Sequence, residues 1–188
     1  GYRVVEEGLC GRTSIFEDAV RKGRKGIDWL PILLEVHSPL DIVVIMLGTN
    51  DCKTYYGADA EQIASGVEAL VQMVQEYDPD IEVLVASPIA LGDGVWEEGY
   101  DPEFNAHSVE VSRQLPAAYR TVAGRRCVQY IAASDYAQPS DTDREHMNEE
   151  GHRRFAQGIG NKIEQMIWHR EQRSEHKGLE LGEWRSVS

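Results

Sequence analysis

Asp41-Ile42-Val43-Val44-Ile45-Met46-Leu47 is an apolar run without polar alternation, and it ends abruptly at Gly48. A strand in the middle of a parallel sheet has this pattern, because helices cover both of its faces. We therefore predict a central, doubly covered strand over residues 41–47. The segments on either side of it indicate how the rest of the sheet is built.

These flanking segments alternate between strand-like and helix-like patterns. Further strands are predicted over residues 2–5, 81–86 and 127–133, and helices over residues 27–36, 59–77, 104–123 and 149–168. Pro31 suits the first turn of a short buried helix, whereas Pro116 should kink or divide its helix. Asp59 and Gln62 have the spacing of a capping box. The alternation predicts parallel βαβ units, and hence a three-layer α/β/α, doubly wound parallel sheet.

The length of 188 residues favours a single domain with a tail. We place the domain at residues 1–168 and a charged tail at residues 169–188, which lacks apolar periodicity and is predicted to be flexible. Because Gly1 stands directly at a predicted strand, we expect the domain to be N-terminally truncated.

Composition excludes several classes of partner. The net charge of −13 argues against nucleic acid, because neutralising phosphates requires clustered Lys and Arg. Three widely spaced cysteines indicate neither a disulfide framework nor a zinc site, so we expect free thiols and a cytoplasmic location. No apolar run approaches the roughly 20 residues of a membrane span. The histidines lack metal-ligand spacing, and we expect neither metal nor cofactor.

Three polar loops stand where functional residues of such a sheet gather. Residues 8–13 and 48–51 follow predicted strands, and residues 139–146 precede the last helix. Ligands of open parallel sheets bind beyond the carboxyl ends of the strands, so these loops should form one site. Taken alone, two of these loops have plainer explanations: residues 48–51 could be a simple turn, and Asp143 and His146 could be surface polar residues before a helix, where negative charge is favoured.

Taken together, the three loops resemble a known family. Glu6-Glu7-Gly8-Leu9-Cys10-Gly11-Arg12-Thr13, Gly48-Thr49-Asn50-Asp51 and Asp143-Arg144-Glu145-His146 are similar to the second, third and fifth sequence blocks of the SGNH/GDSL hydrolases, in the same order. The surrounding sequence looks closest to the arylesterase and acyltransferase members. The resemblance covers roughly residues 2–167 and implies the flavodoxin-like SGNH hydrolase fold.

The resemblance also implies a role for each loop. Gly11, through its backbone N–H, and Asn50, through its side-chain amide, would donate to the oxyanion of an acyl-transfer transition state. Asp143 would orient His146, which would act as general base and then general acid. The implied substrate is a small-molecule ester with a short acyl chain, either an aryl ester or a carbohydrate acetyl ester. The acyl group would pass to water or to another alcohol.

The chain departs from the family at the nucleophile. The family's serine lies in a Gly-Asp-Ser-Leu-like block at the end of the first strand, and no Gly-Asp-Ser occurs here. The nearest match, Gly92-Asp93-Gly94, has glycine in place of serine. We therefore expect the first strand to be missing, a slot with unpaired backbone groups between its neighbours, and no activity for the chain as it stands.

Two nearby residues could be mistaken for the nucleophile. Ser14 is the serine nearest to the proposed oxyanion hole, but the family gives no precedent for it. Cys10 is expected to be a small buried side chain, because nothing near it in the sequence would lower its pKa. Asp51 is expected to brace its loop through hydrogen bonds.

Two functional hypotheses follow. The first is a serine esterase or acyltransferase, and the alternative is a non-catalytic binding or interaction domain that retains the SGNH fold. A flavodoxin-like cofactor binder is a weaker third reading, because no phosphate-binding loop follows a visible first strand. Residues 91–104, with Trp96 and Tyr100, could form one wall of the site or an oligomer contact, so a homo-oligomer remains open.

Overall fold

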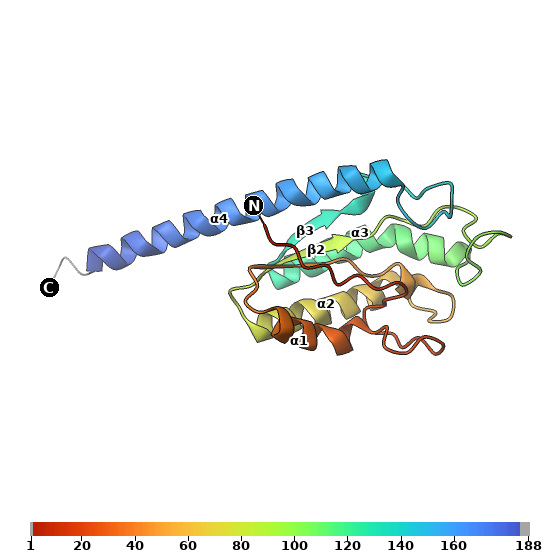
Figure 1. Cartoon of the computed structure of the whole chain (residues 1–188), viewed down its shortest axis with the longest axis horizontal. Coiled ribbons are helices and arrows are strands. Elements are labelled where there is room, and N and C mark those ends of the chain that lie inside the picture. The colour runs from red at the N-terminus through yellow and green to blue at the C-terminus, as the bar shows by residue number, and fades with distance from the viewer. Residues whose placement is uncertain (1, 185–188) are drawn as a thin grey trace.

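The computed structural model describes residues 2–184 and shows a parallel sheet between two layers of helices (Figure 1). Its strands are β1 (Ile42–Ile45), β2 (Glu82–Ser87) and β3 (Gln129–Ala132). They lie in the order β1-β2-β3, and both pairings are parallel. The predicted α/β class with a parallel sheet is confirmed.

Helices cover both faces of this sheet, as the alternation of patterns predicts. The helices α1 (Gly26–His37), α2 (Ala60–Tyr77) and α3 (Ala106–Arg126) lie on one side, and α4 (Glu149–Trp184) lies on the other (Figure 1). Short 3-10 helices follow two strands, η1 (Asn50–Cys52) and η2 (Ala133–Asp135). Along β2, Val83 and Val85 pack into the first layer while Leu84 and Ala86 pack toward α4. This alternation is the two-residue period of a strand covered on both faces.

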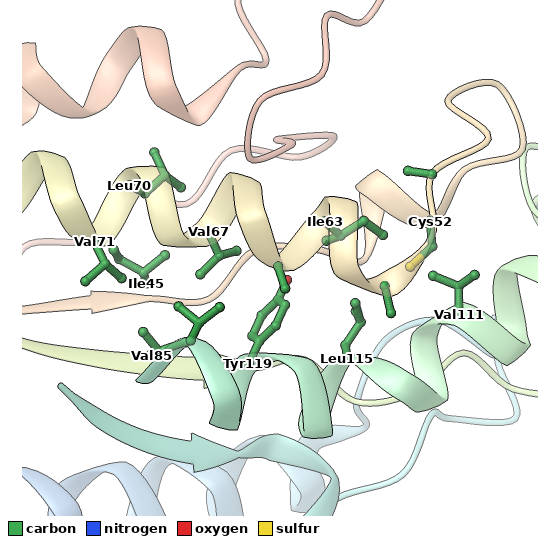
Figure 2. Packing of buried hydrophobic residues seen from close by; sticks show 14 of the residues in the cluster. Ile45, Cys52, Ile63, Val67, Leu70, Val71, Val85, Val111, Leu115 and Tyr119 are labelled. Carbon is green, nitrogen blue, oxygen red and sulfur yellow. The ribbon is translucent and has the colours of Figure 1, made fainter. Parts of the chain in front are cut away.

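The larger core lies between the sheet, α2 and α3. Figure 2 shows Val67 of α2 pointing toward Tyr119 of α3, with Leu115 of α3 in the same layer, and all three side chains are buried. Burying a side chain of this size stabilises the fold by roughly 1.5–3 kcal/mol. The one polar atom of the group is satisfied, because the Tyr119 hydroxyl donates to the Leu47 carbonyl at 2.7 Å.

The helix boundaries confirm one local prediction and correct two. The Asp59 carboxylate accepts from the Gln62 N–H at 2.8 Å, and the Gln62 side chain accepts from the Asp59 N–H at 3.0 Å, so the capping box is confirmed. Pro116 does not divide α3, because the buried Leu115 beside it holds the helix against the core. Pro31 lies inside α1 and not in its first turn, because the helix already begins at Gly26. That helix is also only partly buried.

The position of β1 differs from the prediction. It is an edge strand and not a central one, and Val44 and Met46 are 40% and 41% exposed. The predicted strand over residues 2–5 is wrong, because this segment has no sheet pairing among the described residues. Both differences have the same physical reason. A segment forms a strand only when it pairs with a neighbour, and no described strand lies between residues 2–5 and β1.

A cavity of about 460 Å³ runs along the outer edge of β1. Its walls come from β1, from α1 residues such as Leu30 and Leu34, and from Val5 and Leu9 of the extended N-terminal segment. Glu7 fastens that segment to α1, with its Oε1 atom 2.6 Å from His37 Nε2. The cavity lies between the N-terminal segment and β1, which are the two segments between which the sequence predicts a slot.

The predicted flexible tail is helical in its described part. Helix α4 continues through residue 169 to Trp184, while residues 185–188 of the predicted tail lie outside the described residues. Arg170 pairs with Asp41 at 3.1 Å and Arg173 pairs with Glu82, so the sheet supports the helix beyond residue 169. In the part of the chain that the structure describes, every helix is too short or too polar to cross a membrane.

Candidate active site

The loop after β1 holds Asn50 in a fixed place. Gly48 adopts a φ of +128°, which L side chains rarely adopt, and a Cβ atom there would collide with the Tyr119 hydroxyl. The chain then enters η1, whose first residue is Asn50. Asn50 lines one end of the cavity along β1. Tyr119 and the turn at Gly48 thus determine the backbone position of Asn50.

Asp51 connects this loop to the N-terminal loop. The Ser14 N–H lies 2.9 and 3.1 Å from the two Asp51 carboxylate oxygens, and the Ser14 hydroxyl donates to the same carboxylate. Both residues are fully buried. Burial raises the pKa of Asp51 to about 6, although the bonds from Ser14 act in the opposite direction. The predicted bracing role of Asp51 is confirmed, and the Ser14 hydroxyl is committed to it.

The N-terminal loop turns sharply at Gly11. Its φ is +78°, and a Cβ atom there would lie 3.0 Å from the Arg21 guanidinium. Cys10 is exposed, and the prediction that it is buried is wrong, because the turn buries Gly11 in its place. Among the described residues, neither the Gly11 N–H nor the Asn50 amide donates a hydrogen bond. Gly11 is buried, whereas Asn50 is partly exposed and lines the cavity along β1.

Asp143 and His146 form a hydrogen-bonded pair in the loop before α4. His146 Nδ1 lies 2.8 Å from Asp143 Oδ2, and the side chain of His146 is 68% exposed. Asp143 Oδ1 accepts the backbone N–H groups of Glu145 at 3.0 Å and of His146 at 2.9 Å. Burial alone would raise the pKa of Asp143, but these bonds and the imidazole outweigh it and lower the pKa to about 2. Asp143 is thus an ionised partner for His146 at neutral pH.

Charged side chains connect the loop after β1 to the surroundings of Gly11, and a second charged group stands beside His146. The Lys53 ammonium, just after η1, lies 2.5 Å from Glu103 Oε2, and Arg21 Nη2 beneath Gly11 lies 3.8 Å from the same oxygen. Burial raises the pKa of Glu145 above its ordinary value, and this effect outweighs the opposing influence of His146 and Lys53. Glu145 Oε1 is 3.9 Å from His146 Nε2. Glu103 therefore connects the surroundings of Gly11 and Asn50, whereas Gly11 and His146 lie outside the lining of the cavity along β1.

Residues 91–104 contribute contacts that sequence reasoning missed. Arg144 stacks over the Tyr100 ring, with its Cζ atom 4.1 Å from the ring centroid, and it pairs with Glu97 at 2.7 Å. Asp93, in the nearest match to the family's nucleophile block, is exposed and pairs with Arg113 at 2.8 Å. The only sequence signal for these contacts was an arginine between the two site residues and an aromatic pair in a glycine-rich loop.

A parallel sheet between two layers of helices, with a hydrogen-bonded aspartate and histidine before its last helix, is the arrangement that the sequence motifs imply. The chain belongs to the GDSL-like lipase/acylhydrolase family, whose model matches residues 1–154. A search of curated protein sequences gave no match.

Solved structures of esterases share this fold. A carbohydrate acetylesterase from Sinorhizobium meliloti is 33% identical, with a TM-score of 0.81 over 88% of this chain and 79% of that one. An aryl esterase from M. smegmatis is 28% identical, with a TM-score of 0.80 over 87% of this chain and 78% of that one. The family and these neighbours agree with the fold that the sequence motifs imply.

Proposed function

We propose that this chain is the greater part of a serine esterase that cleaves short-chain carboxylic esters, aryl or carbohydrate acetyl esters among them. The observation that carries the proposal is the 2.8 Å contact between His146 Nδ1 and Asp143 Oδ2 in a chain of the GDSL-like family. That contact leaves Nε2 of the imidazole as the atom that would take a proton from a serine hydroxyl. The solved neighbours that act on acetylated carbohydrates and aryl esters support the substrate class.

The oxyanion would be held by Asn50 and Gly11. An acyl-transfer transition state places negative charge on the former carbonyl oxygen, and a preorganised donor can lower the barrier by roughly 3–4 kcal/mol. The Asn50 amide donates without carrying charge, and the turn at Gly11 presents a backbone N–H. The brace between Ser14 and Asp51 joins the two loops that carry these donors. Asp143 would keep His146 in the tautomer that serves as base.

The nucleophile is the part of the proposal that lies outside the 188 residues, which contain no Gly-Asp-Ser sequence. We propose that such a segment pairs with the outer edge of β1, where the cavity lies. Its serine would then stand at the carboxyl end of β1, next to Asn50. The chain alone is expected to be inactive. In the complete enzyme, the reaction would be hydrolysis when water accepts the acyl group.

The test is to join a strand-forming Gly-Asp-Ser segment to the N-terminus and to measure hydrolysis of 4-nitrophenyl acetate. We expect activity that is lost when the added serine becomes alanine. His146→Ala should abolish it, Asp143→Asn should lower kcat on the order of 10⁴-fold, and Asn50→Ala should lower it roughly 10²–10³-fold. His107→Ala, at an exposed site on α3, is the matched control and should leave the rate unchanged. Full activity of His146→Ala would refute the assignment.

A second candidate is a binding domain that retains the fold without catalysis. The observation that favours it is the absence of Gly-Asp-Ser from these residues. It predicts that the joined protein binds an acetylated sugar or an aryl ester, as measured by calorimetry, without turning it over. Hydrolysis that depends on His146 would exclude this candidate.

A further inference from the structure

Arg144 is tied through its main chain to the loop of residues 91–104. Its carbonyl accepts the Gly92 N–H at 2.7 Å, and its own N–H donates to the Ser140 carbonyl at 2.9 Å. The residue adopts a φ of 58°, a left-handed conformation that is uncommon outside glycine. Such a conformation persists only where surrounding contacts determine it.

The side chain of Arg144 supplies further contacts to the same loop. Nη1 donates to the carbonyls of Asp93 and Gly94 at 3.0 Å each and to Glu97 Oε2 at 2.7 Å. The guanidinium also lies over the Tyr100 ring, which is a favourable cation–π arrangement. The loop is shaped for this side chain, because a Cβ atom on Gly94 would collide with Arg144 Nη1.

The same turn places Asp143 and His146. Arg144 has a left-handed backbone conformation and stands between Asp143 and the next two residues, whose backbone N–H groups donate to Asp143 Oδ1 at 3.0 and 2.9 Å. The imidazole then meets the second carboxylate oxygen. A change in the conformation of residue 144 would therefore move the carboxylate relative to the imidazole, although Arg144 makes no contact with either group itself.

We propose that Arg144 is a positioning residue that fastens the Asp143 and His146 pair to residues 91–104, so that this loop sets the orientation of the imidazole. The effect of Arg144 on catalysis rests on the proposed function, in which His146 is the general base. Arg144 acts through its neighbours, and its effect should appear in the His146 ring before any substrate is present.

The experiment is NMR on the ¹⁵N-labelled chain as it stands, reading which ring nitrogen of neutral His146 carries the proton. In the wild type the proton should be on Nδ1, bonded to Asp143. In Arg144→Ala we expect the Nδ1–H fraction to fall by about half, toward the mixture of a free imidazole. Arg144→Lys keeps a positive charge to pair with Glu97 but loses the planar guanidinium with its several donors. It should give an Nδ1–H fraction between those of the wild type and Arg144→Ala.

Arg113→Ala is the matched control, because Arg113 is also an arginine that pairs with this loop, at Asp93, but does not touch residues 143–146. It should leave His146 unchanged. If Arg144→Ala fails to fold, as judged by circular dichroism, Glu97→Gln weakens the same fastening from the loop side and should shift the tautomer in the same direction. A wild-type tautomer in a folded Arg144→Ala, or in Glu97→Gln where Arg144→Ala does not fold, would overturn the proposal.

Failure of this proposal can be told apart from failure of the proposed function. In the protein joined to a Gly-Asp-Ser segment, Arg144→Ala should lower kcat by roughly tenfold to a hundredfold with KM within about twofold, as misplaced catalytic groups do. A tautomer shift without any change in kcat would keep the positioning role and reject catalysis by His146. An unchanged tautomer in an enzyme whose activity depends on His146 would reject the positioning role and keep catalysis by His146.

Discussion

Replacing Asp51 with asparagine should make the protein more stable at neutral pH. Asp51 is fully buried, and burial raises its pKa to about 6 although Ser14 donates to it. An asparagine carries no charge and can still accept the Ser14 N–H through its side-chain oxygen, while its amide N–H can donate to the Ser14 hydroxyl. The substitution therefore removes a buried charge and keeps the main contact of the brace.

The sign and size follow from the two pKa values. The ordinary pKa of 3.8 applies to the unfolded chain and about 6 to the folded one, so the folded state binds more protons between these pH values. The contribution of Asp51 to the unfolding free energy of the wild type should therefore rise as the pH falls from 7 to 4. At roughly 1.4 kcal/mol per pH unit, the difference amounts to about 3 kcal/mol.

The assay is urea unfolding followed by circular dichroism at several pH values between 4 and 7. Asp51→Asn should be more stable than the wild type by up to about 3 kcal/mol at pH 7, and the gap should close toward pH 4. The lowered pKa of Asp143 has the opposite effect, but its contribution is lost only below this range, as the pH falls toward about 2. Asp93→Asn, at an exposed site, serves as the control. Parallel pH profiles for wild type and Asp51→Asn would refute the reasoning.

Substitutions at three further positions test the surrounding elements of the fold, each by urea unfolding. Tyr119→Phe removes the bond to the Leu47 carbonyl and should destabilise by about 1 kcal/mol, with unchanged packing. Gly48→Ala should cost roughly 2–4 kcal/mol, because of both its positive φ and the collision with Tyr119, and Tyr119→Phe should relieve part of that loss. Asp59→Ala should cost about 1 kcal/mol through the lost cap of α2, whereas Asp59→Asn should be close to neutral.

Local patterns predicted the parts of the fold that depend on local physics. The capping box at Asp59 and the apolar face of α2 involve residues three or four positions apart, so the sequence alone contains the relevant contacts. The same holds for the contact between Asp143 and His146, which needs only one turn of chain. Helices on both faces followed from the alternation of strand and helix patterns.

Relations between distant segments could not be predicted in this way. The apolar run at residues 41–47 indicated a strand correctly, but it does not specify which strands flank it, and β1 lies at an edge. Residues 2–5 have strand propensity, but a segment with strand propensity forms no inter-strand hydrogen bonds unless a neighbouring strand is present. The contacts of Arg144 depend on the path of residues 91–104, which follow no period, so no pattern pointed to them.

The two halves of the site are held by separate braces, and this predicts how their variants combine. Ser14 and Asp51 hold the oxyanion side, whereas Arg144 holds the imidazole side, and they share no hydrogen-bond partner. Among the described residues, the halves meet at Glu103, whose carboxylate pairs with Lys53 and Arg21 and whose carbonyl accepts the Thr54 N–H at 2.8 Å. The Glu103 side chain is half exposed, so solvent screens both ion pairs. Effects of Asp51→Asn and Arg144→Ala on unfolding should then add within about 0.5 kcal/mol. A larger deviation in the double variant would mean that the pair at Lys53 transmits strain across the site, and Glu103→Gln should abolish it.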